Sequence, residues 1–197
     1  MTNNIFRWSG LLLIAGAVLL GAAIVMVAMK PAVSQPLSPQ ASLLLLLSAI
    51  LLLLALPAMY GRQADTAGWI GLIGYILLQP GLLLLVLSAA PALLFPTQNL
   101  ALGQNMVYFL LGIAFVLGLL LTGIATIRAG VYPRWAGILL LAATAGFFFS
   151  FFVAEFLPPL VGQVGNAFLG IMLALSLAGI GLSIWTRAPQ QSGLSVS

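Results

Sequence analysis

Long apolar stretches alternate with short polar or proline-containing breaks along the chain, and the alternation occurs six times. Each stretch contains roughly 20 residues, the number that an α-helix needs to cross a hydrocarbon layer about 30 Å thick. The pattern predicts an all-α, polytopic transmembrane bundle of six helices, at residues 8–29, 42–60, 67–90, 104–127, 135–157 and 162–185. We expect one integral membrane domain over residues 1–197, in which residues 186–197 form a short cytoplasmic tail.

The residues at the ends of these stretches predict the orientation of the chain. Six spans place both termini on one side of the membrane, and Lys30 is the one cation of six expected on the other side. The other five cations are Arg7, Arg62, Arg128, Arg134 and Arg187. Tryptophans, which prefer the headgroup layer, are expected on that same side: Trp8, Trp69, Trp135 and Trp185. Because short cytoplasmic loops carry an excess of Lys and Arg, both termini are expected to face the cytoplasm.

Three of the expected spans begin in a similar way. Trp8, Trp69 and Trp135 are each followed by a glycine two positions later, and each precedes an apolar run. One interpretation is a repeat of three helical hairpins, each crossing the membrane out and back. The alternative is convergence, because tryptophan favours the interface and glycine is common in this chain, with 21 copies.

Composition narrows the possible functions. Hydrophobic residues make up 63% of the chain and charged residues 4%, and the mean hydropathy is +1.25. Soluble domains carry about 25% charged residues, so the composition indicates a membrane protein with the lipid bilayer as its first partner. The chain has no Cys or His and only two acidic residues. We therefore expect no catalytic residues, no metal, no cofactor and no enzyme activity, and the scattered cations fit lipid headgroups rather than nucleic acid.

A few polar residues are expected near the middle of the membrane. Gln79 follows Trp69 by ten residues, or about 15 Å along a helix, and Pro80 directly after it favours a kink. Ser48, Thr144 and Ser176 fall at a similar depth. These four polar side chains either line a ligand-binding pocket at the midplane, or they bond to their own helices while Gln79 supports the kink.

Three further polar residues are expected at the opposite, outer interface. Glu155 is the only acid inside an expected span, about 30 Å from Trp135, and Gln163 and Asn166 open the next span at comparable depth. An intramembrane carboxylate is a candidate functional group. The three residues either form an outer ligand site or are a turn that reaches water.

The stretch from Ala129 to Ala142, AGVYPRWAGILLLA, resembles a segment of small, uncharacterised bacterial multi-pass membrane proteins that are grouped as a domain of unknown function. The similarity extends over most of the chain in length, in the expected number of spans and in the Arg-Trp pair that opens the fifth span. The resemblance implies a bacterial cytoplasmic (inner) membrane location. It implies no catalytic residue.

Two functional hypotheses follow from these patterns. The first is a non-catalytic accessory or scaffold subunit of a larger membrane assembly, packed against other membrane subunits. The alternative is a carrier or binder of a neutral or hydrophobic small molecule, such as a lipid, a quinone or a carotenoid-like compound. A midplane pocket around Gln79 would distinguish the second hypothesis from the first.

Overall fold

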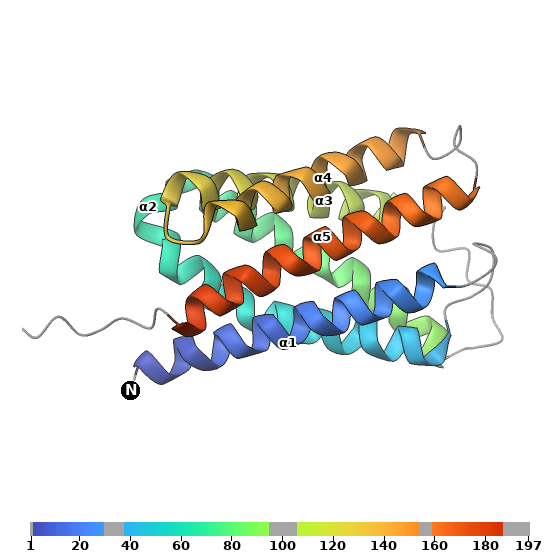
Figure 1. Cartoon of the computed structure of the whole chain (residues 1–197), viewed down its shortest axis with the longest axis horizontal. Helices are drawn as coiled ribbons and strands as arrows, with labels where there is room; N and C mark the ends of the chain where they lie inside the picture. Colours follow the sequence, from blue (N-terminus) through green and yellow to red (C-terminus); the bar gives the residue numbers. More distant parts are fainter. Residues whose placement is uncertain (1, 30–37, 95–105, 154–158, 187–197) are drawn as a thin grey trace, which may run out of the picture.

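The computed structural model describes residues 2–29, 38–94, 106–153 and 159–186. These residues form five α-helices (Figure 1). The helices are α1 (Thr2–Ala28), α2 (Pro39–Leu94), α3 (Met106–Ala129), α4 (Arg134–Val153) and α5 (Pro159–Thr186). Within the described part of the chain, four of them are long and apolar enough to cross a membrane, and the apolar stretch of α4, Arg134–Phe149, is shorter. The predicted all-α membrane protein is therefore supported.

The prediction of six helices was wrong. The segments predicted at 42–60 and 67–90 belong to a single element, α2, because residues 61–67 between them are also helical. Arg, Gln and Ala in this polar stretch are good helix formers, so charge alone did not break the helix. The predicted repeat of three hairpins was built on six separate helices and is wrong for the same reason.

Helix α2 turns back on itself at Gly68. The backbone there leaves the helical region (φ 56, ψ −152), a conformation that glycine adopts without the steric penalty of a side chain. The rings of Tyr60 and Tyr75 stack with their centroids 5.0 Å apart, although 15 residues of straight helix would separate them by about 22 Å. We call residues 39–67 the first arm of α2, residues 69–94 its second arm, and Gly68 the elbow.

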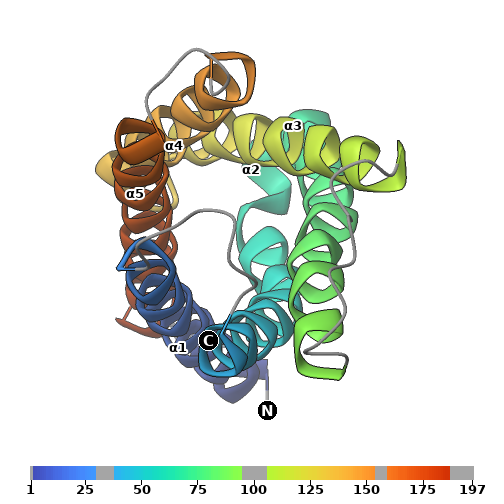
Figure 2. The ribbon, with the colours of Figure 1, turned by 90° about the vertical axis from the view of Figure 1, so that its right-hand side faces the viewer.

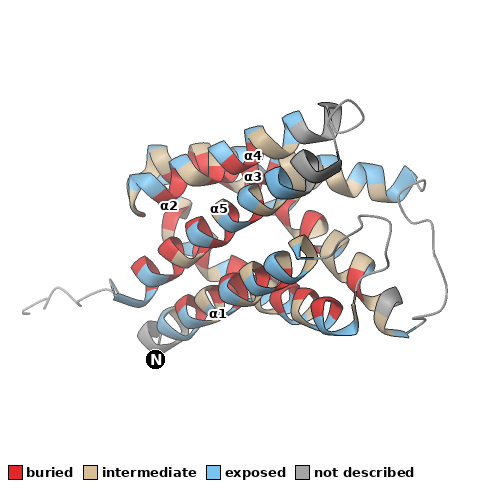
Figure 3. Ribbon diagram, turned by 45° about the vertical axis from the view of Figure 1, so that its right-hand side comes forward, coloured by how far each residue is buried: buried red, intermediate tan, exposed pale blue. Residues whose placement is uncertain are grey.

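The helices form a closed ring. Each packs against the next in sequence, α1 on α2, α2 on α3, α3 on α4 and α4 on α5, and α5 packs back on α1. Figure 2 shows this ring along its axis. Buried residues lie on the inward and interhelical faces, whereas the outer faces expose large apolar side chains such as Val18, Leu54 and Phe149 (Figure 3). This outer surface fits contact with lipid tails.

One end of the ring carries most of the cations, and we call it the basic end. The start of α1, the elbow of α2, the α3–α4 turn and the end of α5 all lie at this end (Figure 1). These segments hold Arg7, Arg62, Arg128 and Arg134. They also hold the four tryptophans, all of which are exposed. The structure thus places the cations and tryptophans of the described chain at one end of the bundle.

Helices α1 and α5 approach each other closely at the basic end. A Cβ atom added to Gly10 would lie 2.8 Å from the carbonyl oxygen of Gly181 and 2.8 Å from the backbone nitrogen of Trp185. A Cβ on Gly181 would in turn lie 2.9 Å from the carbonyl oxygen of Gly10. Small residues allow membrane helices to approach in this way, so the α1–α5 contact closes the ring through backbone packing.

Candidate functional site

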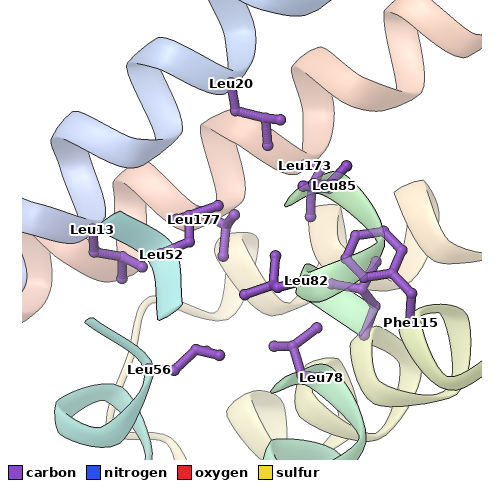
Figure 4. A pocket seen from close by; sticks show the side chains of 11 residues that line it. Leu13, Leu20, Leu52, Leu56, Leu78, Leu82, Leu85, Phe115, Leu173 and Leu177 are labelled. Atoms are coloured by element: carbon purple, nitrogen blue, oxygen red, sulfur yellow. The ribbon is translucent and has the colours of Figure 1, made fainter. Parts of the chain in front are cut away.

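The ring surrounds a cavity that is lined only by apolar side chains (Figure 4). They come from α1, both arms of α2, α3 and α5: Leu13, Leu20, Leu52, Leu56, Leu78, Leu82, Leu85, Phe115, Leu119, Leu173 and Leu177. The cavity between these side chains has a volume of about 20 Å³, close to the space that one water molecule needs. Apolar cavities of this kind stay dry, because water would lose its hydrogen bonds inside them.

Helical periodicity brings these leucines together. Leu52 and Leu56 are one turn apart on the first arm of α2, and Leu78 and Leu82 are one turn apart on the second arm. Because α2 turns back at the elbow, both arms present such a row of side chains to the same central space. The cavity is therefore a consequence of the elbow as much as of the leucine content.

Arg62 ties the first arm of α2 to the end of α5. Its guanidinium donates hydrogen bonds to the carbonyl oxygens of Ser183 (3.2 Å) and Ile184 (3.0 Å). These carbonyls belong to the last turn of α5, where no following turn supplies N–H donors. The positive charge also interacts favourably with the negative end of the α5 dipole, so Arg62 caps this helix.

Tyr132 ties the same arm to the turn between α3 and α4. Its buried hydroxyl donates a hydrogen bond of 2.7 Å to the carbonyl oxygen of Met59. Burial raises the pKa of Tyr132 well above its usual value, and the nearby Arg62 lowers it by a smaller amount. The phenol therefore stays protonated and keeps this hydrogen bond at any ordinary pH.

Three of the predicted midplane residues form hydrogen bonds with backbone carbonyls. The Ser48 hydroxyl donates to Gly16 of α1 (2.8 Å), and the Ser176 hydroxyl donates to Ala136 of α4 (2.6 Å). Thr144 donates to Leu140 of its own helix (2.7 Å). All three side chains are buried. They lie in helix contacts, and the structure does not bring them together in the central cavity.

Of the other predicted site residues, Gln79 and Asn166 are not among the residues that line the cavity. Gln79 is half-buried on the second arm of α2, next to Leu78, but it is not among the lining residues. Asn166 is exposed on α5. Gln163 lies in α5, but its side chain is outside the description, and Glu155 lies outside the described residues. The proposed outer site of these last three residues thus stays a prediction.

Sequence reasoning did not identify the cavity or the two ties at the basic end. Leucine is so frequent in this chain that no single leucine stands out as a lining residue. Arg62 was interpreted as an orientation signal, and Tyr132 entered only as part of the Ala129–Ala142 segment. A usable sequence signal for the cavity was the spacing of Leu52, Leu56 and Met59 on the first arm. This spacing places them on one face of the helix together with the polar Gln63.

Comparison with protein-family models, with curated proteins and with solved structures gives no match for this chain. The resemblance of the Ala129–Ala142 segment to bacterial multi-pass proteins therefore stays a prediction from the sequence. The function has to be argued from the cavity and its surroundings.

Proposed function

We propose that this chain is a non-catalytic membrane protein that binds the hydrocarbon part of a small apolar molecule in its central cavity. The supporting observation is the cavity itself, which is lined by ten leucines and one phenylalanine from four helices. A polar ligand would lose its hydrogen bonds to water there and find no replacement among the lining side chains, at a cost of a few kcal/mol per group. A hydrocarbon incurs no such cost and gains dispersion contacts.

The size of the cavity favours a slender ligand. The resting space open to a water-sized sphere is about 20 Å³, so a ligand has to displace leucine side chains as it enters. A linear alkyl chain needs the smallest displacement, because it is only one methylene wide. The ligand class that we propose is therefore a single-chain lipid rather than a quinone or a carotenoid.

The proposed location is a bacterial inner membrane with the basic end on the cytoplasmic side. Its support is the excess of cations at that end and the sequence resemblance described above. The accessory- or scaffold-subunit hypothesis stays a separate prediction, which requires a partner that copurifies with the chain in mild detergent.

A photo-crosslinking experiment tests the binding proposal. The probe is hexadecane with a diazirine at its terminal carbon, added to the full chain in phosphatidylcholine nanodiscs. We expect saturable labelling of peptides that contain the cavity residues, with competition by unlabelled hexadecane. Non-saturable labelling confined to the outer, lipid-facing residues would refute the proposal.

Two matched variants on the first arm of α2 sharpen the test. Leu56→Phe fills the cavity and should weaken saturable labelling about tenfold. Leu54→Phe makes the same chemical change on a side chain that is 60% exposed on the outer face, and it should leave labelling unchanged. Equal effects of both variants would contradict binding in the cavity.

A further inference from the structure

Two inward rows of side chains change from apolar to polar toward the basic end. On the first arm of α2, Leu52 and Leu56 line the cavity, and Met59 and Gln63 continue the row at spacings of three and four residues. This spacing keeps all four side chains on one face of the helix. The same face that borders the cavity thus ends in an amide at the basic end.

Helix α3 repeats this arrangement. Phe115 and Leu119 line the cavity, and Thr122 and Thr126 follow at the same spacings of three and four residues. Helix α1 has a buried serine, Ser9, one turn before the lining residue Leu13. Three helices therefore present polar groups on the basic side of an apolar cavity.

Several of these polar atoms are buried without a hydrogen-bond partner among the described residues. They are the Oε1 atom of Gln63 and the Oγ1 atoms of Thr122 and Thr126. The exposed fractions of these residues are 1%, 2% and 0%. The hydroxyl of Ser183, in the last turn of α5 at the basic end, is also buried without a hydrogen-bond partner among the described residues. Buried polar groups in proteins nearly always have a partner, so these atoms, which come from α2, α3 and α5, are candidates for binding a polar group.

We infer that these atoms form a subsite for the headgroup of a neutral long-chain alcohol whose alkyl chain occupies the central cavity; the inference rests on the function proposed above. The Gln63 Oε1 atom only accepts hydrogen bonds, so it requires a ligand that donates one. A hydroxyl donates to Gln63 and accepts from a threonine hydroxyl at the same time.

The axial positions fit an amphiphile. Thr126 lies seven residues beyond Leu119, or about 10 Å along α3, and Gln63 lies seven residues beyond Leu56, also about 10 Å along α2. A hydroxyl at this level leaves the alkyl chain pointing into the leucine cavity. The intervening Met59 has a flexible side chain that adapts to a chain passing it. A carboxylate fits less well, because its oxygens only accept hydrogen bonds and would face the Gln63 acceptor without a proton between them.

Competition against the diazirine probe in the same nanodiscs tests this assignment. Unlabelled hexadecan-1-ol, hexadecane and palmitate share one chain length and differ at the headgroup. For the wild-type chain, hexadecan-1-ol should displace the probe at about a tenfold lower concentration than hexadecane. Palmitate should have no advantage over hexadecane. An equal potency of alcohol and alkane, or a higher potency of palmitate than of the alcohol, would overturn the assignment without touching the proposed function.

Variants locate the headgroup. Gln63→Leu preserves the size of the side chain and removes the acceptor, so it should abolish the advantage of the alcohol while the potency of hexadecane stays unchanged. Thr126→Val should reduce the advantage severalfold. Gln79→Leu makes the same change outside the cavity lining and should retain the full tenfold advantage.

The possible failures are distinguishable. If the probe is not bound saturably by the wild-type chain, the proposed function fails, and the headgroup subsite fails with it. If the probe binds but Gln63→Leu keeps the full alcohol advantage, only the subsite is overturned. The wild-type comparison of alcohol and alkane remains informative even if a variant does not fold.

Discussion

The basic end and the middle of the bundle are held together by different interactions. At the basic end, side chains hydrogen bond to backbone carbonyls of other elements, and helix backbones touch through Gly10 and Gly181. In the middle, helices also meet closely, at Gly118 against the Leu78 backbone and through the Ser48 hydrogen bond to Gly16, but the leucine side chains around the cavity make non-directional contacts. Directional bonds fix one arrangement, whereas leucines adjust their rotamers at small cost. The basic end is therefore rigid, whereas the leucine lining of the cavity in the middle is compliant and can receive a ligand.

The largest expected effect tests the tight backbone contact on α1. Gly10→Ala places a methyl group 2.8 Å from two backbone atoms of α5, so we expect a loss of about 3 kcal/mol in stability. The matched variant in the middle, Gly21→Ala, meets only the Ala174 Cβ at 3.6 Å, an ordinary contact, and should be neutral. Thermal unfolding in detergent measures both. Equal losses would contradict a rigid end beside a compliant middle.

The next effect concerns the cap on α5. Arg62→Ala removes two hydrogen bonds from a charged donor and leaves the Ser183 and Ile184 carbonyls without them, with an expected loss of about 2 kcal/mol. Arg128→Ala removes an exposed arginine from the same end and should cost less than about 0.5 kcal/mol. Chemical unfolding in mixed micelles compares the two variants, and a similar loss of stability for both would contradict a capping role for Arg62.

The smallest effect is the tie through Tyr132. Tyr132→Phe removes one hydrogen bond and should cost about 1 kcal/mol at neutral pH. The folded-state pKa of Tyr132 lies above that of a free tyrosine, so the folded state holds the phenolic proton more strongly. The stability linked to this proton is complete below pH 10 and declines as the pH rises above that value. Stability curves from pH 8 to 11.5 should therefore fall more steeply for the wild type than for the variant.

The sequence predicted the helical, membrane-embedded character well but misjudged one boundary. Apolar length and sparse charge are sufficient to predict helices that cross a bilayer. The break at residues 61–67 was misread because a polar stretch was taken to end a helix, whereas Arg62 and Gln63 remain helical and only Gly68 departs. The sequence shows which residues would be costly to expose to lipid. It does not show that the backbone leaves the helical conformation at Gly68.

The candidate site was harder to predict for a different reason. A buried polar residue in an apolar helix is easily noticed, so Ser48, Thr144 and Ser176 were natural candidates. Each of them bonds to a backbone carbonyl, and this partner depends on the packing of helices that sequence alone does not give. The cavity depends on which leucines face inward from both arms of α2. Among so many leucines, only the three-dimensional arrangement selects them.

The elbow has a consequence for how the protein is made. The two arms of α2 are joined by helical residues that carry the exposed Asp65 beside Arg62, without an intervening extended loop. Moving these charges through hydrocarbon would be costly, so we expect residues 61–67 to stay on one side of the bilayer. We therefore expect the two arms to enter the bilayer as a pair, which brings half of the lining leucines together before α5 is synthesised.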